Sequence, residues 1–275
     1  MKLSAISSAV ALVVSLGTAG FVGYNHYNNV GAGSAPATLG SIDSSIHTYM
    51  MSHPEIIMQM VQKLRQQQAE KMQADASDSA KAVLAHHAKF VDSEHAIQEG
   101  NKNAPVTIVE FFDYQCSACA ATYPELHKFL QSPYAKKNVR VVYRSFPFFG
   151  PASVYAAKAV IAAEAQGKSM DLHNALFKSG LIEHKMKISD VLSMAKKIPG
   201  MNIAKLKTDI GSTWVKQEML NDANLVKALK LIATPAFVFT PTSTKLANAK
   251  NTKFINSGMP AADIAANVKS VSDNM

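Results

Sequence analysis

The sequence has 275 residues, 48% of them hydrophobic, and a formal net charge of +8. A chain of this length can bury a sizeable core and fits one or two domains. With 13 Gly, 11 Pro and two Cys it is neither collagen-like nor a disulfide scaffold. The lysines are scattered, with no Arg-rich run and no nucleic-acid-binding motif. We therefore expect a mildly basic globular protein that does not bind nucleic acid.

The first 24 residues have the pattern of a targeting segment. Lys2 is followed by an uncharged stretch whose apolar part centres on residues 9–16, and small residues at 17–20 offer a cleavage site. This pattern favours a signal peptide over residues 1–24. A retained signal anchor is the alternative, because the uncharged run is nearly long enough to span a bilayer. Residues 25–41, rich in Asn, Gly, Ser and Ala, predict a linker.

Residues 42–98 predict a helical arm. Ser52 is placed to cap a helix with Pro54 in its first turn and Glu55 three residues on. One apolar stripe then faces away from Gln, Lys and Arg side chains, and a second run follows; their members are Ile57, Val61, Leu64, Met72, Val83, Leu84, Ala88 and Val91. An arm this short has no core of its own, so its stripe must pack on something. It either docks on the following domain or, as we favour, forms a homodimer through residues 42–98.

The two cysteines form the motif Cys116-Ser117-Ala118-Cys119. Residues 106–112, rich in β-branched and aromatic side chains, predict a buried strand before it, and residues 120–130 have helical spacing after it. Cys116 therefore lies at a strand-to-helix junction, where free backbone N–H groups and the helix dipole lower the pKa of a thiol. Cys119 lies one turn later. The pattern predicts Cys116 as the attacking nucleophile and Cys119 as the resolving thiol.

Two other interpretations of this motif are weaker. A zinc or iron–sulfur site needs four ligands, and the chain has no other cysteine, although a dimer would bring two pairs together. A purely structural disulfide across four residues constrains the unfolded chain little and so contributes little stability. A CxxC pair between a strand and a helix in an exported protein is typical of a redox site.

The residues around the two cysteines resemble those of a known family. Residues 106–119, VTIVEFFDYQCSAC, look like the active-site region of the bacterial DsbA-like thiol:disulfide oxidoreductases of the thioredoxin superfamily. Pro124 matches the helix-kinking proline of that family, and residues 234–239, TPAFVF, resemble its cis-proline strand. The resemblance implies an α/β thioredoxin-like fold over residues 99–275 with a helical insertion at about 147–231, preceded by the α-helical arm.

The resemblance also implies roles for single residues. Pro235, if cis, has no N–H to donate and lets a client strand lie beside Cys116, while Thr234 offers its main chain to that strand and its side chain to the sulfur. Glu110 matches the buried acid beneath the disulfide, a candidate proton acceptor for Cys119. The open alternative for Glu110 is a structural ion pair with a basic residue such as Arg144.

The implied function is a periplasmic thiol:disulfide oxidoreductase that introduces or isomerises disulfides in exported proteins. Its cofactor is the redox-active disulfide alone, and its implied partners are exported proteins with cysteines and a membrane DsbB-like or DsbD-like protein. Strongly oxidising members carry a His between the cysteines where this chain has Ser117-Ala118, so we expect a less oxidising potential. The alternatives are a dimeric holdase-type chaperone whose CxxC is secondary, and a metal or electron-transfer protein.

The rest of the chain gives shorter predictions. Residues 139–143 and 252–256 are expected to be strands, and residues 260–271 the closing helix. The aromatic turn at residues 146–151 either lines a client groove or belongs to the core.

Overall fold

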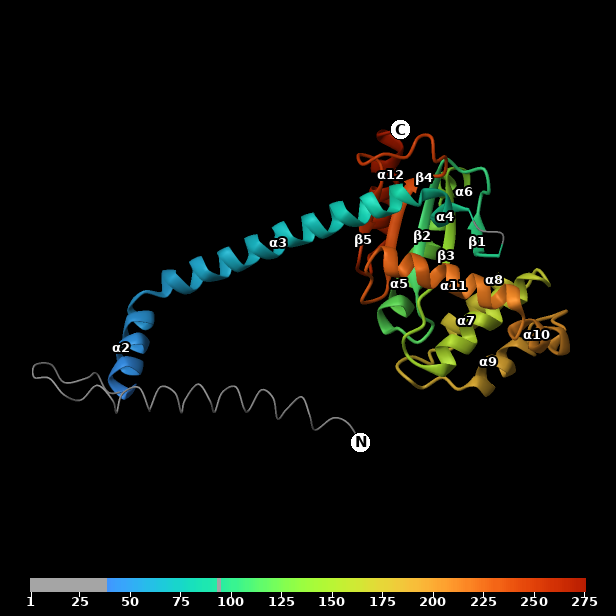
Figure 1. Cartoon of the computed structure of the whole chain (residues 1–275), viewed down its shortest axis with the longest axis horizontal. Coiled ribbons are helices and arrows are strands. Elements are labelled where there is room, and N and C mark those ends of the chain that lie inside the picture. The colour runs from blue at the N-terminus through green and yellow to red at the C-terminus, as the bar shows by residue number, and fades with distance from the viewer. Residues whose placement is uncertain (1–38, 93–94) are drawn as a thin grey trace, which may run out of the picture. The chain divides into compact units, whose positions relative to one another are not determined.

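The computed structural model describes residues 39–92 and 95–275 (Figure 1). The predicted signal segment 1–24 and the predicted linker up to residue 38 lie outside the described residues. The chain divides into two compact units, one ending at Gln66 and the other covering Gln67–Met275. In the described part, no helix combines the length and the apolar character needed to cross a membrane.

The first unit is helical, as predicted. Helix α2 (Leu39–Ser52) begins inside the predicted linker, and helix α3 (Pro54–Ala85) begins at the expected proline, whose missing N–H is not needed in a first turn. The predicted cap at Ser52 is wrong. Its hydroxyl donates to the carbonyls of Thr48 at 2.9 Å and Tyr49 at 3.0 Å, so it closes α2 rather than opening α3.

Large apolar side chains of this unit are exposed. Nine of them keep between 37% and 70% of their surface accessible: Ile42, Ile46, Tyr49, Met50, Met51, Ile57, Met58, Met60 and Leu64. Nothing is described for the side chain of Met72. Contact of apolar surface with water is unfavourable, so an exposed apolar surface of this extent is uncommon unless it binds a partner.

The end of the arm belongs to the second unit instead. Val83, Phe90 and Val91 are fully buried in a core that includes the central strands, so for this segment the docking alternative is correct. The expected boundary between residues 98 and 99 also falls inside strand β1 (Ile97–Gly100), which the sequence did not reveal because it is only four residues long. The apolar run at the end of the arm is thus part of the domain core.

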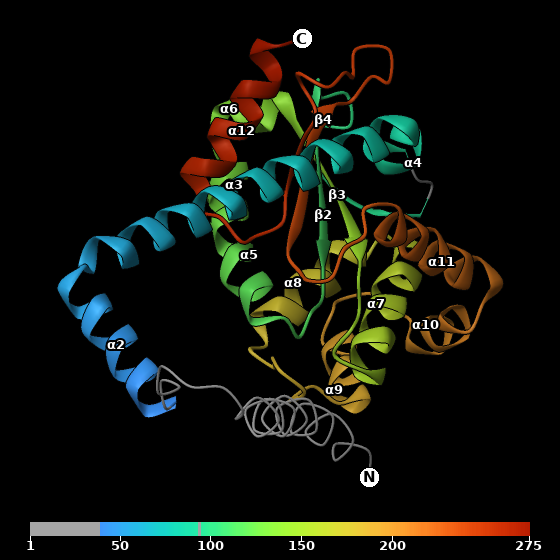
Figure 2. The same cartoon turned by 60° about the vertical axis from the view of Figure 1, so that its left-hand side comes forward.

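A mixed five-stranded sheet, in the order β1-β3-β2-β4-β5, forms the centre of the second unit (Figure 2). The four strands beside β1 are β2 (Val106–Phe112), β3 (Val139–Ser145), β4 (Ala236–Pro241) and β5 (Lys253–Ile255). Strands β2 and β3 are parallel, and the other pairs are antiparallel. Every residue of β2, β3 and β4 is buried, and most of these residues are apolar, as in strands covered on both faces.

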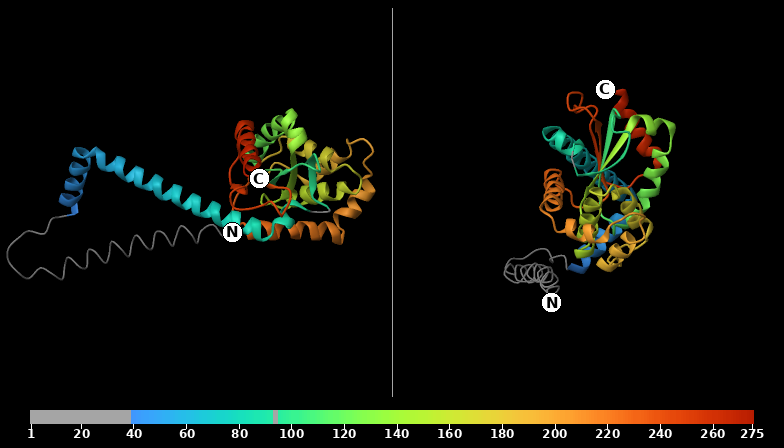
Figure 3. Two further views of the ribbon diagram at one scale, coloured as in Figure 1. Left: turned by 90° about the horizontal axis from the view of Figure 1, so that it is seen from above. Right: turned by 90° about the vertical axis from the view of Figure 1, so that its right-hand side faces the viewer.

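Helices cover both faces of this sheet (Figure 3). The remaining helices are α4 (His87–Val91), α5 (Ser117–Leu130), α6 (Pro133–Asn138), α7 (Pro151–Glu164), α8 (Ser169–Lys178), α9 (Ile188–Ala195), α10 (Ile203–Ile210), α11 (Thr213–Ala228) and α12 (Ala261–Asp273). Helices α7 to α11 form the predicted insertion between β3 and β4. Helices α5 and α12 lie on one side of the sheet, and α4 and α11 on the other (Figures 2 and 3).

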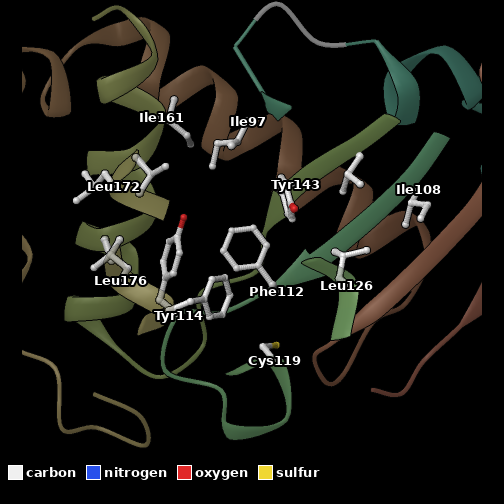
Figure 4. Packing of buried hydrophobic residues seen from close by; sticks show 14 of the residues in the cluster. Ile97, Ile108, Phe112, Tyr114, Cys119, Leu126, Tyr143, Ile161, Leu172 and Leu176 are labelled. Carbon is white, nitrogen blue, oxygen red and sulfur yellow. The ribbon is translucent and has the colours of Figure 1, made fainter. Parts of the chain in front are cut away.

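Alternation along the strands divides the buried residues into two cores. On β2, Ile108 and Phe112 face the larger core with α5, α7, α8 and α12, whereas Val109 and Phe111 face the smaller core with α4 and α11. Figure 4 shows part of the larger core, to which Phe112, Tyr143 and Cys119 all belong. The fold class is therefore the expected α/β thioredoxin-like one with a helical insertion and an N-terminal helical arm.

Candidate active site

Cys116 occupies the predicted junction between β2 and α5. It is the N-cap residue of α5, with an extended backbone, and its Sγ accepts the Cys119 N–H at 3.4 Å. The chain reaches this position through a turn in which the Cys116 N–H donates to the Asp113 carbonyl at 3.1 Å. The first thiol is thus held at the open N-terminus of a helix, where a negative charge is stabilised.

The environments of the two thiols differ. Both are free in this structure, with Cys116 5% and Cys119 0% exposed. Hydrogen bonding from the Cys119 side chain, opposed by burial and aided by Thr234, lowers the pKa of Cys116 to about 6. Burial and the bond to Cys116 raise the pKa of Cys119 far above its usual value. Cys116 is therefore a thiolate at neutral pH while Cys119 keeps its proton.

The peptide bond between Thr234 and Pro235 is cis and lies next to the reactive sulfur. Cys116 Sγ donates to the Thr234 carbonyl at 3.3 Å across 118 residues of sequence. The Thr234 hydroxyl is buried and has no hydrogen-bond partner among the described residues of this dithiol form, so it is available to a thiolate on Cys116. The structure thus brings together Thr234, Pro235 and the CxxC motif as the sequence predicts.

Glu110 lies on β2 and is 2% exposed. Burial, together with the nearby Cys116 and Glu99, raises the pKa of its carboxyl to about 8. The alternative of an ion pair with Arg144 is wrong, because Arg144 points to the opposite core and binds Glu218 at 2.8 Å and Asp222 at 3.2 Å. Glu110 is thus a buried acid without a cation among the described residues.

Asp113 is a part of the site that sequence reasoning missed. Its carboxylate accepts the Gln115 N–H at 2.8 Å, the Ser153 hydroxyl at 2.6 Å, and the N–H groups of Phe148 and Phe149 at 2.8 and 3.1 Å. These bonds tie the helical insertion to the segment before the first cysteine. The only sequence signal was an acid directly after the buried strand.

The aromatic turn divides between the two predicted environments. Phe149 packs partly against the larger core and Phe146 against the smaller one, while Phe148 is 46% exposed. Two of the three rings therefore pack against a core while staying partly exposed, and the third is exposed.

Gly258 was also missed. A Cβ at this position would lie 2.5 Å from the Thr122 hydroxyl and 3.8 Å from the Pro235 ring. The Thr122 hydroxyl donates to the Ala118 carbonyl at 2.9 Å, inside the CxxC turn. Glycine is needed here because the chain before α12 approaches both halves of the site.

In the described part of the chain, no group of three or more His, Cys, Asp or Glu side chains is placed to hold a metal ion.

A thioredoxin-like sheet whose CxxC motif faces a cis-proline defines a thiol:disulfide oxidoreductase of the DsbA-like class. Comparison with family models agrees, since the model described as "Thioredoxin" matches residues 92–255, more than half of the chain. The chain belongs to the thioredoxin family. A second model, described as "Copper resistance protein ScsC N-terminal domain", matches residues 41–71 in the arm.

Individual relatives are distant. The chain is 26% identical over 143 residues to "Probable disulfide bond formation protein D" of Bacillus anthracis, covering 50% of this chain and 66%, just under two thirds, of that protein. Among solved structures, a thioredoxin-like oxidoreductase from Silicibacter pomeroyi DSS-3 is 27% identical, with a TM-score of 0.58, covering 68% of this chain and 97% of that one. BcfH of Salmonella enterica Typhimurium is 24% identical, with a TM-score of 0.67 and coverage of 84% and 95%, and shares the fold.

Proposed function

We propose that the protein is a periplasmic thiol:disulfide oxidoreductase that introduces or isomerises disulfides in exported proteins. One observation carries the proposal: Cys116 is a low-pKa thiol at a helix N-terminus beside the cis Thr234-Pro235 bond, and Cys119 is a buried, protonated thiol one turn away. Such a pair exchanges disulfides through a mixed disulfide on the outer sulfur, which the inner sulfur resolves.

The oxidising direction begins with a client thiolate. It attacks the sulfur of Cys116 in the disulfide form, and Cys119 leaves as a thiolate that takes up a proton. A second client thiolate then attacks the client sulfur of the mixed disulfide. Cys116 leaves as a thiolate, the client is oxidised and the protein holds the dithiol. In isomerisation, the thiolate of Cys116 first attacks a wrong client disulfide and forms a mixed disulfide. Another thiol of the same client then attacks the client sulfur of this mixed disulfide, which closes a different client disulfide and releases Cys116.

Refolding of a reduced client and of one with scrambled disulfides tests the activity in the full chain. Cys116→Ala should abolish both reactions, because it removes the attacking sulfur. Cys119→Ala should accumulate a mixed disulfide with the client, visible on a non-reducing gel, because the inner thiol that resolves it is missing. Full refolding activity in Cys116→Ala would contradict the proposal.

The membrane redox partner and the periplasmic location belong to the same proposal. The redox state of Cys116 and Cys119, trapped with a thiol-alkylating agent in the living cell envelope, separates the possibilities. A disulfide indicates an oxidase reset by a DsbB-like protein, and a dithiol an isomerase reset by a DsbD-like protein. Equilibration with glutathione measures the expected potential, which should be less oxidising than about −120 mV.

We also propose that the chain forms a homodimer through residues 42–98, with the contact made by the first part of this arm. The exposed apolar side chains between Ile42 and Leu64 support this, since burying them between copies removes them from water. The same surface also favours the second candidate function, a holdase-type chaperone, for which Cys116→Ala would keep full protection of a client against aggregation.

Sedimentation of the full chain tests the dimer. Ile57→Lys combined with Leu64→Lys places two charges on the apolar stripe and should yield monomers. The control is Gln59→Lys, which adds a charge to the opposite face of the same helix and should leave the dimer intact. A monomeric wild-type chain would contradict the proposal.

A further inference from the structure

A cluster of titratable groups lies on the face of the sheet that packs into the larger core with the inner sulfur. It spans three neighbouring strands and two helices of the larger core, and its members beyond the cysteines are Glu99 on β1, Tyr143 on β3, Glu110 on β2, Tyr123 and His127 on α5, His173 on α8, and Tyr114 in the β2–α5 loop. Figure 4 shows Tyr114, Tyr143 and Cys119 on this side of the sheet. The disulfide exchange described above uses none of these groups.

Cys119 has a proton-transfer problem that this cluster addresses. To resolve a mixed disulfide it must lose its proton before its sulfur attacks Cys116, which breaks the bond to the client and releases the client as a thiolate. The Cys119 side chain is completely buried, so water cannot take the proton directly. A buried base that acts on Cys119 is the carboxylate of Glu110, whose charge contributes to the raised pKa of this thiol. Glu110 becomes a neutral acid in this step.

Glu110 must in turn return its proton to solvent, although it is itself only 2% exposed. Its neighbour on β3 is Tyr143, the residue directly opposite in the parallel register. Paired residues on adjacent strands share one face of the sheet, and the strands lie about 5 Å apart. Tyr143 is therefore the next polar side chain along the sheet from Glu110.

Tyr143 connects this row to the edge of the domain. Its hydroxyl donates to Glu99 Oε2 at 2.8 Å, and Glu99 Oε1 lies 3.5 Å from Nδ1 of His127. The side chains of Glu99 and His127 are 25% and 22% exposed, in contrast to the 2% of Tyr143. Glu99 is thus the member of this row that water reaches, while His127 turns Nδ1 to Glu99 and keeps Nε2 buried.

We propose that Glu99 and His127, with Glu99 held in place by Tyr143, form the solvent end of a proton route that serves Glu110 and the resolving cysteine. The inference rests on the proposed disulfide exchange and assigns positioning residues to it. In the oxidising direction the route runs inward: Glu110 gives its proton to the Cys119 thiolate as that sulfur leaves, and regains one through Glu99 and His127. No electrons move along the route, so only protons need to balance.

The other titratable groups that face the cluster are unsuited to this role. Burial raises the pKa of Tyr114 and of Tyr143 well above the usual value, and raises that of Tyr123 to about 12. Burial and the nearby His127 lower the pKa of His173 to about 3, so it stays neutral. None of these four exchanges a proton near neutral pH.

Glu99 stays charged in the same range. Burial alone would raise the pKa of its carboxyl, but the bonds from His127 and Tyr143 outweigh this and lower it. Its negative charge also contributes to the raised pKa of Glu110. The pair of carboxyls thus differs in protonation near neutral pH, with the outer one ionised and the inner one close to its titration point.

A two-phase reaction separates attack from resolution in the full-length, reduced protein. Cys116 attacks an aromatic disulfide such as dithiobis-nitrobenzoate and releases one coloured thiolate. Cys119 then displaces the second, so the second phase reports the resolving step. Both phases are followed by stopped-flow absorbance in weak and in strong buffer, and with added imidazole.

In weak buffer the second phase should slow about a hundredfold in Glu110→Gln, which lacks the base, and about tenfold in Glu99→Gln and His127→Ala. The first phase should be unchanged in Glu99→Gln and His127→Ala. Imidazole should restore the second phase of His127→Ala, because a soluble base replaces the missing one at the surface. His86→Ala, which removes an exposed histidine outside the cluster, is the matched control and should match wild type.

Two results would overturn the proton route. The first is a second phase in Glu99→Gln and His127→Ala that equals wild type in weak buffer. The second is a slowed phase that does not respond to imidazole or buffer, since this indicates altered packing alone. An absent first phase in wild type would instead contradict the proposed function, so the two failures are distinguishable.

Discussion

The two sides of the central sheet bury charge in opposite ways. On the side of α4 and α11, the guanidinium of Arg144 is 1% exposed and is matched by the carboxylates of Glu218 and Asp222. It also donates to the carbonyl of Lys89 at 2.7 Å, which joins the end of the arm to the sheet. On the side of α5, Glu110 has no cation among the described residues and faces two thiols instead.

This difference indicates a structural role for the charges on the side of α4 and α11, and a chemical role for the charge on the side of α5. A buried ion pair supplies a counterion to each of its charges, so its role is to fix how α11 and α4 meet the sheet. A buried acid without a counterion has a raised pKa and is ready to exchange a proton near neutral pH. Each side therefore predicts a different response to the loss of its charged residue.

The largest effect is expected on the ion-paired side. Arg144→Met leaves two buried carboxylates without a counterion and should lower the free energy of unfolding by about 3–5 kcal/mol. Burial already raises the pKa of Asp222 to about 7 despite the opposing Arg144, so the variant should recover stability as the pH falls and the carboxyls protonate. Urea unfolding, followed by fluorescence of the single Trp, measures this.

Lys216→Met, on the exposed face of α11, is the control for Arg144→Met and should be neutral within about 0.5 kcal/mol. In folded Arg144→Met the first coloured thiolate should still be released at the wild-type rate. If Arg144→Met were as stable as wild type but released the first coloured thiolate slowly, the two sides of the sheet would not differ in role.

The opposite result is expected for Glu110→Gln. The folded pKa of about 8 lies above the usual 4.5, so the native state holds a proton that the unfolded chain has lost between these values. Charging Glu110 therefore costs stability as the pH rises from about 4.5 to 8. The variant should be more stable than wild type above pH 8 by up to about 5 kcal/mol, and equal to it below pH 4.5.

The same urea titration at several pH values measures the effect of Glu110→Gln. Glu218→Gln on the other side of the sheet is the matched variant, and its loss of a partner for Arg144 should destabilise the protein. Lower stability of Glu110→Gln at high pH would show that its carboxylate is stabilised by a partner in the folded protein.

The sequence predicted one side of this comparison better than the other. Strand β2, the CxxC motif and the Thr-Pro pair were found because their local patterns are strong: a continuous apolar run, a fixed spacing and a proline before a strand. The pairing of Arg144 was not predicted, because its partners Glu218 and Asp222 lie on a helix, 74 and 78 positions further along the chain. Glu99 was missed for a related reason, since its four-residue strand has no pattern of its own.

The smallest effect is expected at Thr234, and it tests whether neutral groups alone control charge on the α5 side. Cys116 is bonded to Cys119 and Thr234, and no cation is among the causes of its low pKa. Thr234→Val keeps the shape but removes the hydroxyl, so the pKa of Cys116 should rise from about 6 toward about 7. Ultraviolet absorbance of the thiolate during a pH titration measures the pKa of Cys116.

Thr234→Ser, which keeps the hydroxyl, should stay near the wild-type value. Since neutral donors are screened less than ion pairs, the difference between Val and Ser should persist in high salt, and its loss there would indicate that a surface cation sets the pKa instead.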